Sequence, residues 1–398
     1  MKITNVETIT VTMPFEAPIR WAFGVRTGTT RTIVKVFTDE DIVGLGETYG
    51  GRETAAGINA CKSLIVGEDP FKIERLVSKF RGFSGRGVLP VGNPIYFSAL
   101  EIACWDIIGK AMNTPLYNLL GGACYKKIPF SAFVFYRYKG TGGVGGESSP
   151  KDIVKYCSDI MDTHGFKVLK LKGGVLNPKI EIETIKEMRA TFGGEIGLRI
   201  DPNAIWSVAT SIRTINELEK YGLEYVEDPT WNIEGMSQVR KKVNVPLSTN
   251  MCVISPDHIP PAIRLGAIDI VLVDLFQWGG ILNSKKLAAI AETFQWGLSM
   301  HSNAELGVST AAMLHFAAST PYLTYACDQH YHHHVDDIIT KPFKYEDGCM
   351  TVPDGPGLGV ELDEDKIDKY TRFSKEKGEA RHTFDPSRPD WVPLQPSW

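Results

Sequence analysis

The sequence has 398 residues, of which 43% are hydrophobic and 23% are charged, and its formal net charge is −4. This length fits an α/β barrel joined to a smaller domain, with enough apolar residues for a sizeable core. The acidic balance argues against a nucleic-acid or membrane-surface partner, and no apolar run reaches the length of a membrane span.

The N-terminus and the cysteines indicate where the protein works. Residues 1–13 alternate apolar and polar side chains and lack the long apolar core of a signal peptide. The seven cysteines are scattered and none belongs to a CxxC pair, which favours reduced thiols over a zinc site. We therefore expect a cytoplasmic protein.

The first 125 residues predict an α+β domain. Residues 1–13, 30–39 and 42–50 have strand-like patterns that suggest an antiparallel meander. Between the first two strands, PFEAPIRWAFGVRTGTTR (14–31) is expected to form a loop. The stretch from Pro94 to Met112 predicts a long buried helix.

From about residue 126 to 355 the chain repeats a unit in which a short apolar run is followed by an amphipathic stretch. The runs start 21 to 37 residues apart, which is the size of a βα unit, and eight of them predict a barrel of parallel strands. They are Ser131–Tyr136, Val168–Lys172, Gly197–Asp201, Tyr225–Asp228, Pro246–Asn250, Ile270–Asp274, Leu298–Ser302 and Thr324–Asp328. The Gly-rich residues 140–149 are expected to be a flexible loop rather than a phosphate cradle.

Polar side chains stand at the ends of seven consecutive predicted strands. Active sites of such barrels lie at the C-terminal ends of the strands, so these side chains are the candidate functional residues. They are Lys170, Lys172, Asp201, Glu227, Asn250, Asp274, His301 and Asp328.

The lysines and the oxygen-bearing side chains suggest a base beside a metal ion. Lys170 and Lys172 share one face of a strand, and a buried lysine has the lowered pKa that a catalytic base needs. The alternative places both at the solvated rim. Asp201, Glu227 and Asn250 are oxygen donors that favour a hard cation such as Mg²⁺. The alternative is a structural acid cluster paired with the lysines.

His301 follows Asp274 by one strand, which suggests an imidazole oriented by a carboxylate. The alternative is a hydrogen-bonded core histidine. With a lysine on one side and a His–Asp pair on the other, the site could place a base and an acid on opposite faces of a substrate.

Five stretches resemble the enolase superfamily in its mandelate racemase subgroup, and within it the glucarate dehydratases. They are FKVLKLKGGVLNPKIE, LRIDPNAIWS, EYVEDPTWNIEGM, PLSTNMCVIS and SMHSNAELGVS. The resemblance implies a modified TIM barrel of (βα)7β type (126–355), an α+β capping domain (1–125) and a C-terminal segment (356–398) that returns to the capping domain. It also implies a homo-oligomer.

The resemblance assigns roles to the candidate residues. Lys172 would be the base, Lys170 would contact the substrate carboxylate, and His301 with Asp274 would form the second catalytic pair. Asp201, Glu227 and Asn250 would bind Mg²⁺, with Asn250 typical of the glucarate dehydratase branch.

Further residues are expected to contact the substrate. Asn203, Asn303 and His330 match family residues near it, and Phe133 stands where a tyrosine is expected. Arg20, Arg26 and Arg31 could bind a distal carboxylate, or they could belong to a solvated basic loop. His332, His333 and His334 are expected to form a polar loop rather than a metal site.

The predicted activity is removal of the proton α to the carboxylate of an acid sugar, followed by loss of the β-hydroxyl to give a 2-keto-3-deoxy acid. A racemase or epimerase with the same bases is one alternative. A catalytically silent protein that binds sugar acids is another.

Overall fold

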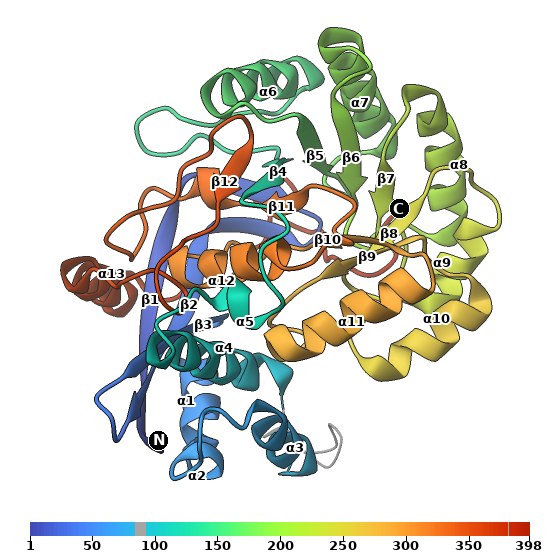
Figure 1. Cartoon of the computed structure of the whole chain (residues 1–398). Helices are drawn as coiled ribbons and strands as arrows, with labels where there is room; N and C mark the ends of the chain where they lie inside the picture. The colour runs from blue at the N-terminus through green and yellow to red at the C-terminus, as the bar shows by residue number, and fades with distance from the viewer. Residues whose placement is uncertain (84–92, 381) are drawn as a thin grey trace.

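The protein folds into a parallel α/β barrel with an antiparallel capping domain beside it (Figure 1). This computed structural model describes residues 1–83, 93–380 and 382–398. Among the described residues, no helix combines the length and apolarity needed to cross a bilayer.

The capping domain is a three-stranded sheet covered by helices. Its strands pair in the order β1 (Ile3–Trp21), β2 (Gly24–Thr38), β3 (Val43–Tyr49), as the predicted meander requires. The long helix α4 begins after the Asn93 side chain, which accepts a hydrogen bond from the Ile95 N–H, and packs on the sheet. The helices of this domain are α1 (Arg52–Ala60), α2 (Lys62–Ile65), α3 (Ile73–Phe83), α4 (Pro94–Ala111) and α5 (Leu116–Leu119).

The loop expected at residues 14–31 is instead a β-hairpin, so this prediction is wrong. β1 continues to Trp21 and β2 starts at Gly24, with Ile19 opposite Arg26. The pairing register breaks between Pro14 and Ile19. β1 lies at the edge of the sheet, where prolines are tolerated, so Pro14 and Pro18 bend the strand without ending it.

The barrel has eight parallel strands, as predicted, linked by helices in (βα)7β order. The strands are β4 (Lys127–Val134), β5 (Val168–Lys172), β6 (Gly197–Asp201), β7 (Tyr225–Glu227), β8 (Leu247–Thr249), β9 (Ile270–Val273), β10 (Gly297–Met300) and β11 (Cys327–Gln329). The helices are α6 (Pro150–His164), α7 (Pro178–Phe192), α8 (Val208–Leu218), α9 (Asn232–Arg240), α10 (Ile259–Leu265), α11 (Ile281–Thr293) and α12 (Gly307–Ala318). Short 3₁₀ turns are η3 (Glu219–Tyr221), η4 (Pro256–His258) and η5 (Tyr331–His333).

Strand pairing runs from β10 through β9, β8, β7, β6, β5 and β4 to β11. The ring is completed just before β11, where the N–H groups of Thr324 and Tyr325 donate to the Leu298 carbonyl at 3.1 and 3.2 Å. On β5, Leu169 and Leu171 belong to the apolar core, so Lys170 and Lys172 take the opposite face, inside the barrel.

The C-terminal segment crosses both parts of the molecule. β12 (Cys349–Thr351) pairs antiparallel with β4, and α13 (Glu364–Lys377) packs beside β1. Residues 382–398, here called the strap, continue past the hairpin. The strap ends on the barrel, where the Ser397 N–H donates to the Ile205 carbonyl at 2.8 Å.

Two buried glutamates join the capping domain to the barrel. Glu101 on α4 accepts from the N–H groups of Ile281 and Leu282, each at 2.8 Å, at the start of α11. Glu47 on β3 accepts from the N–H groups of Leu306 and Ser309 at 2.8 and 2.9 Å, at the start of α12. These carboxylates satisfy donors that helix starts leave unpaired.

Replacing Glu101 should loosen this joint. Glu101→Ala leaves two buried backbone donors and the Trp105 indole N–H without their acceptor, so the free energy of unfolding should fall by about 2–4 kcal/mol. Urea denaturation measures the change. Glu74→Ala, which breaks an exposed pair with Lys286 across the same two parts, should have little effect. Equal effects would contradict a role for burial.

Candidate active site

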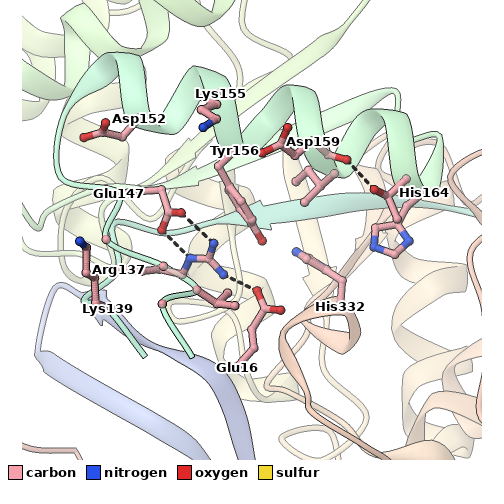
Figure 2. Close-up of a pocket in the computed structure, with 16 residues that line it drawn as sticks. Glu16, Arg137, Lys139, Glu147, Asp152, Lys155, Tyr156, Asp159, His164 and His332 are labelled. Atoms are coloured by element: carbon pink, nitrogen blue, oxygen red, sulfur yellow. Dashed lines mark hydrogen bonds and ion pairs between the residues drawn. The ribbon is translucent and has the colours of Figure 1, made fainter. Parts of the chain in front are cut away.

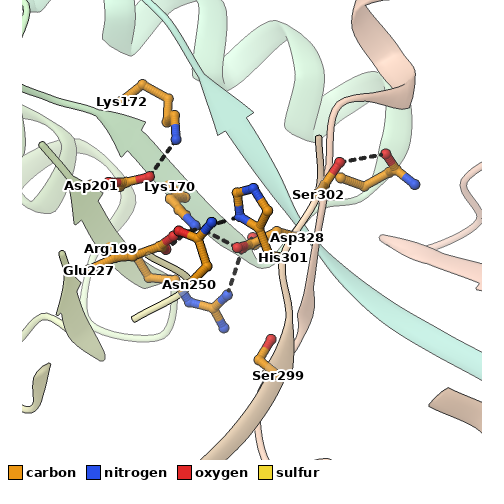
Figure 3. A network of polar contacts seen from close by, with 12 residues as sticks. Lys170, Lys172, Arg199, Asp201, Glu227, Asn250, Ser299, His301, Ser302 and Asp328 are labelled. Atoms are coloured by element: carbon orange, nitrogen blue, oxygen red, sulfur yellow. Dashed lines mark hydrogen bonds and ion pairs between the residues drawn. The ribbon is translucent and has the colours of Figure 1, made fainter. Parts of the chain in front are cut away.

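The two lysines of β5 lie inside the barrel among carboxylates (Figure 3). Lys172 Nζ forms an ion pair with Asp201, and Lys170 Nζ forms ion pairs with Glu227 and Asp328. All of these side chains are buried, so the solvated-rim alternative does not hold. Burial alone would lower the pKa of Lys170, but the carboxylates of Asp328 and Glu227 outweigh it and raise that pKa.

A buried arginine completes this charge network. Arg199 lies two residues before Asp201 on β6, donates to Asp328 at 3.2 Å and pairs with Glu224 at 2.7 Å. Asp328 also accepts from the Ser131 hydroxyl at 2.7 Å. Arg199 was not among the residues predicted from the sequence. One residue separates it from Asp201, as one residue separates Lys170 from Lys172, so Arg199 and Asp201 lie on the same face of β6.

Asp274 and His301 do not form the expected hydrogen bond. Asp274 Oδ1 accepts from the N–H groups of Phe276 and Gln277 at 2.8 and 3.2 Å, so this carboxyl stabilises its own turn. Its Oδ2 and His301 Nδ1 are both buried without a hydrogen-bond partner. His301 Nδ1 instead lies 3.8 Å from Glu227 Oε1. Burial, and then the two lysines, lower the pKa of His301 well below its usual value, so its imidazole is uncharged at neutral pH.

The predicted metal ligands come from three adjacent strands and are all oxygen donors. Asn250 shows how they fit a cation. One terminal atom of its amide lies 3.0 Å from Glu227 Oε1 and 3.1 Å from Asp228 Oδ2, and the other lies 3.3 Å from His301 Nε2. With nitrogen toward the carboxylates every hydrogen bond is satisfied. In the opposite orientation of the amide, the side-chain oxygen of Asn250 lies beside Glu227. A hard cation such as Mg²⁺ needs oxygen ligands of this kind.

Within the described residues, the acidic and histidine side chains whose ligand atoms lie close enough to share a cation form a different set, which does not contain Asp201. One atom each from Glu227, His301 and Asp328 lies within 4.8 Å of the others, among the residues that the structure describes. Glu227 belongs to both sets, and burial followed by the nearby Asp201 carboxylate raises its pKa well above the usual value. A cation here would relieve the repulsion between these carboxylates.

A cavity of about 220 Å³ opens beside this network. Its barrel side is formed by Lys172, Asn203, Asn250, His301, Asn303 and His330. Its other side comes from the hairpin residues Trp21, Phe23 and Arg26, together with His382 of the strap. The cavity is therefore lined by four of the predicted substrate residues, namely Asn203, Asn303, His330 and Arg26. His382 had no local signal in the sequence.

Two predicted substrate residues lie elsewhere. Arg20 pairs with the buried Asp385 at 2.9 Å, so its guanidinium holds the strap rather than a substrate. Phe133 is fully buried under the lysines, with its ring centre 4.6 Å from Lys170 Nζ and 4.9 Å from Lys172 Nζ. Side chains two residues apart on a strand point to the same face, so Phe135 lies on the same face as Phe133. Phe135, and not Phe133, lines the cavity.

The histidine tract is largely buried. The Nε2–H groups of His332 and His333 both donate to the Phe133 carbonyl at 3.1 Å, and burial lowers the pKa of His332 to about 3. These imidazoles support β4 and do not form the polar loop that was predicted. They are also absent from the ligand-type cluster found in the described chain.

A larger cavity of about 620 Å³ lies between the Gly-rich loop and α6 (Figure 2). Arg137 is its buried cation, and Glu147 and Glu16 both pair with it, at 2.7 and 2.5 Å. This arginine is therefore already neutralised. The smaller cavity, which contains Lys172 and His301, has the groups needed for proton transfer.

Family models cover most of the chain. Residues 3–121 match the mandelate racemase / muconate lactonizing enzyme N-terminal domain, and residues 152–366 match the enolase C-terminal domain-like family. The chain therefore belongs to the enolase superfamily, in its mandelate racemase subgroup.

Relatives in this superfamily carry different activities in their names. A "probable glucarate dehydratase" of Streptomyces coelicolor is 36% identical, covering 93% of both chains. An "L-Ala-D/L-Glu epimerase" of Clostridium acetobutylicum is 31% identical, covering 88% of this chain and 96% of the relative. These relatives belong to the same superfamily and are named for different reactions.

Solved structures share the fold along the whole chain. An enolase from Thermobispora bispora, complexed with magnesium and formate, is 38% identical with a TM-score of 0.93, and each chain covers 100% of the other. An enolase from Pseudomonas fluorescens with bound magnesium, potassium and tartrate is 34% identical with a TM-score of 0.92 over 100% of this chain and 99% of that one.

The ion pairs of Lys170 should be essential for stability. Lys170→Met leaves the buried Glu227 and Asp328 without their shared cation, so the free energy of unfolding in EDTA should fall by about 3–5 kcal/mol. Urea denaturation gives the value. Lys186→Met, which breaks an exposed pair with Glu183, is the matched control and should change little. A fall no larger than that of the control would show that the network contributes nothing.

Proposed function

We propose that the protein is a magnesium-dependent dehydratase of acid sugars. It would remove the proton α to a carboxylate and eliminate the β-hydroxyl, giving a 2-keto-3-deoxy acid. The observation that carries this proposal is the enclosure of Lys172 and His301 in one cavity beside buried oxygen donors. The 36% identity to a "probable glucarate dehydratase" and the magnesium in related structures support it.

The proposed ligands of the ion are Asp201, Glu227 and Asn250. Bound magnesium would supply a fixed positive charge that makes the α-proton more acidic. Lys170 is fully buried and paired with Glu227 and Asp328, so a bound cation would have to take over these carboxylates before its ammonium could contact the substrate carboxylate. Asn203, Asn303 and His330 would orient the hydroxyl groups in the cavity.

Lys172 is the proposed base. Its Nζ is paired as an ammonium with Asp201, so Lys172 must lose a proton and leave this ion pair before its neutral amine can accept the α-proton. His301 reaches the same cavity, and once protonated to imidazolium it would give that proton to the departing β-hydroxyl, which leaves as water. The barrel encloses both groups away from bulk water, which strengthens every electrostatic interaction between them and the substrate.

A racemase or epimerase is the second candidate. Two groups capable of proton transfer line the cavity, and an "L-Ala-D/L-Glu epimerase" is 31% identical. In that case the proton would be removed by one group and returned by the other, and no hydroxyl would leave.

Product analysis separates the two reactions. With a panel of acid sugars and Mg²⁺ we expect a product that reacts with semicarbazide, as a 2-keto acid does, and no activity after chelation. An epimer without semicarbazide reactivity would overturn the dehydratase proposal. Absence of both products, and of deuterium exchange at the α-carbon in D₂O, would overturn catalysis altogether.

Removing the base should separate chemistry from metal binding. Lys172→Ala should lower turnover by at least about 10³-fold, because no group of comparable strength replaces the amine. Calorimetric Mg²⁺ binding should persist, since the oxygen ligands remain. Lys167→Ala, an exposed lysine just before β5, is the control. Retained turnover in Lys172→Ala would exclude this lysine as the base.

A further inference from the structure

The turn that follows β6 has an unusual backbone. Asn203 and Ala204 have positive φ angles of 49° and 59°, so two consecutive residues lie in the left-handed region. Asparagine is tolerated there, but alanine adopts this conformation at a cost, and it persists only where neighbouring groups hold it. Asn203 lines the cavity with Lys172 and His301, so the strained turn lies at the candidate active site.

This turn orients the carboxylate of Asp201. The Asn203 main-chain N–H donates to Asp201 Oδ1 at 2.8 Å, and the Asn203 side-chain amide donates to Oδ2 at 3.1 Å. Both oxygens of a proposed metal ligand therefore accept from a residue of the strained turn. If the turn relaxed to an ordinary backbone conformation, these two donors would move and the carboxylate would lose its orientation.

The barrel supports the turn through two close contacts. The Ala204 N–H donates to the Asp228 carbonyl at 2.6 Å. Gly174, in the loop after β5, lies so near that a Cβ added to it would be 2.5 Å from the Ile205 side chain and 2.6 Å from the Pro202 carbonyl oxygen. The turn therefore has no room to move toward Gly174.

The strap holds the same turn from a distant part of the sequence. The Ser397 N–H donates to the Ile205 carbonyl, and the Ser207 N–H donates to the main-chain oxygen of Trp398, each at 2.8 Å. The Trp398 side chain is partly buried against the main hydrophobic core. These contacts fix the residues that follow Ala204, so a change of the backbone at Ala204 would break them or displace β6.

We propose that Ser397 and Trp398 are positioning residues for the active site. By holding the strained turn, they keep Asp201 and Asn203 in the orientation that binds the cation and the substrate. The inference rests on the proposed function, which makes Asp201 a ligand of the ion. A strap that only stabilised the fold would contribute to the free energy of unfolding and leave the affinity for Mg²⁺ unchanged.

The first experiment removes the strap contacts and measures metal binding by calorimetry. In a variant that lacks residues 392–398 the Mg²⁺ affinity should fall by about tenfold, because it falls in proportion to the share of molecules with the competent turn. Val392→Ser, at an exposed position of the strap, is the control and should bind Mg²⁺ as the unmodified protein does. Thermal unfolding verifies that each variant folds.

Replacing Ala204 tests whether backbone strain is the cause. Glycine adopts a positive φ without the cost that alanine has, so in Ala204→Gly the turn needs less support from the strap. The same deletion in this background should lower the Mg²⁺ affinity by no more than about threefold. An equal loss in both backgrounds, or no loss in either, would overturn the proposal.

A single substitution covers the case in which the deletion variant does not fold. Ser397→Pro removes the N–H that donates to Ile205, whereas Ser397→Ala keeps this N–H and loses only the hydroxyl. We expect Ser397→Pro to weaken Mg²⁺ binding by about three- to tenfold and Ser397→Ala to leave it unchanged. Equal affinities of these two variants would contradict the role of Ser397.

Hydrogen exchange separates this inference from the proposed function. The Ala204 N–H keeps its acceptor, the Asp228 carbonyl, in the deletion variant, so its exchange reports the turn itself and not a lost contact. Site-resolved exchange of this amide in EDTA should be about tenfold faster after the deletion. If the unmodified protein binds no Mg²⁺ and turns over no acid sugar, the proposed function fails, while faster exchange still supports the hold of the strap on the turn. Unchanged exchange would overturn the inference even if dehydration is found.

Discussion

The structure depends on opposite charges that are buried together inside the barrel. Lys170 and Lys172 are held against carboxylates that end neighbouring strands. A charge removed from water is tolerated only when a partner of opposite sign lies at contact distance. The strand register provides this, because Lys172 of β5 pairs in the sheet with Asp201 of β6. The same contacts stabilise the barrel and place the proposed base beside the proposed metal ligands.

The contact between the capping domain and the barrel also depends on buried carboxylates. Glu47 and Glu101 of the capping domain accept from the starts of helices that belong to the barrel. Arg31, beside Glu47, also donates to the carbonyls of Asn303 and Ala304, close in the chain to His301. The capping domain is therefore fixed to the segment that carries site residues, and the hairpin cannot shift without disturbing the cavity.

The proposed catalytic residues and the opposite wall of the cavity come from different parts of the chain. Barrel strands contribute the proposed base, the proposed acid and the proposed ligands of the ion. The hairpin and the strap contribute Arg26, Trp21 and His382, which form the opposite wall of the cavity. Such a division allows the wall to vary while the reactive groups stay in place, in keeping with the different activities named among the relatives.

The sequence by itself determined the eight strands, the common face of Lys170 and Lys172 and the strand ends that carry Asp201, Glu227 and Asn250. These follow from local periodicity and spacing, which decide the face and the end of a strand on which a residue lies. Only the tertiary structure decided the partners. Residues 14–31 pair as a hairpin, Asp274 accepts from its own turn and not from His301, Arg20 pairs with Asp385 of the distant strap, and Arg26 has no ion-pair partner among the described residues. A contact between segments distant in the chain leaves no periodic trace in either of them, and for that reason His382 could not be recognised before the fold placed it.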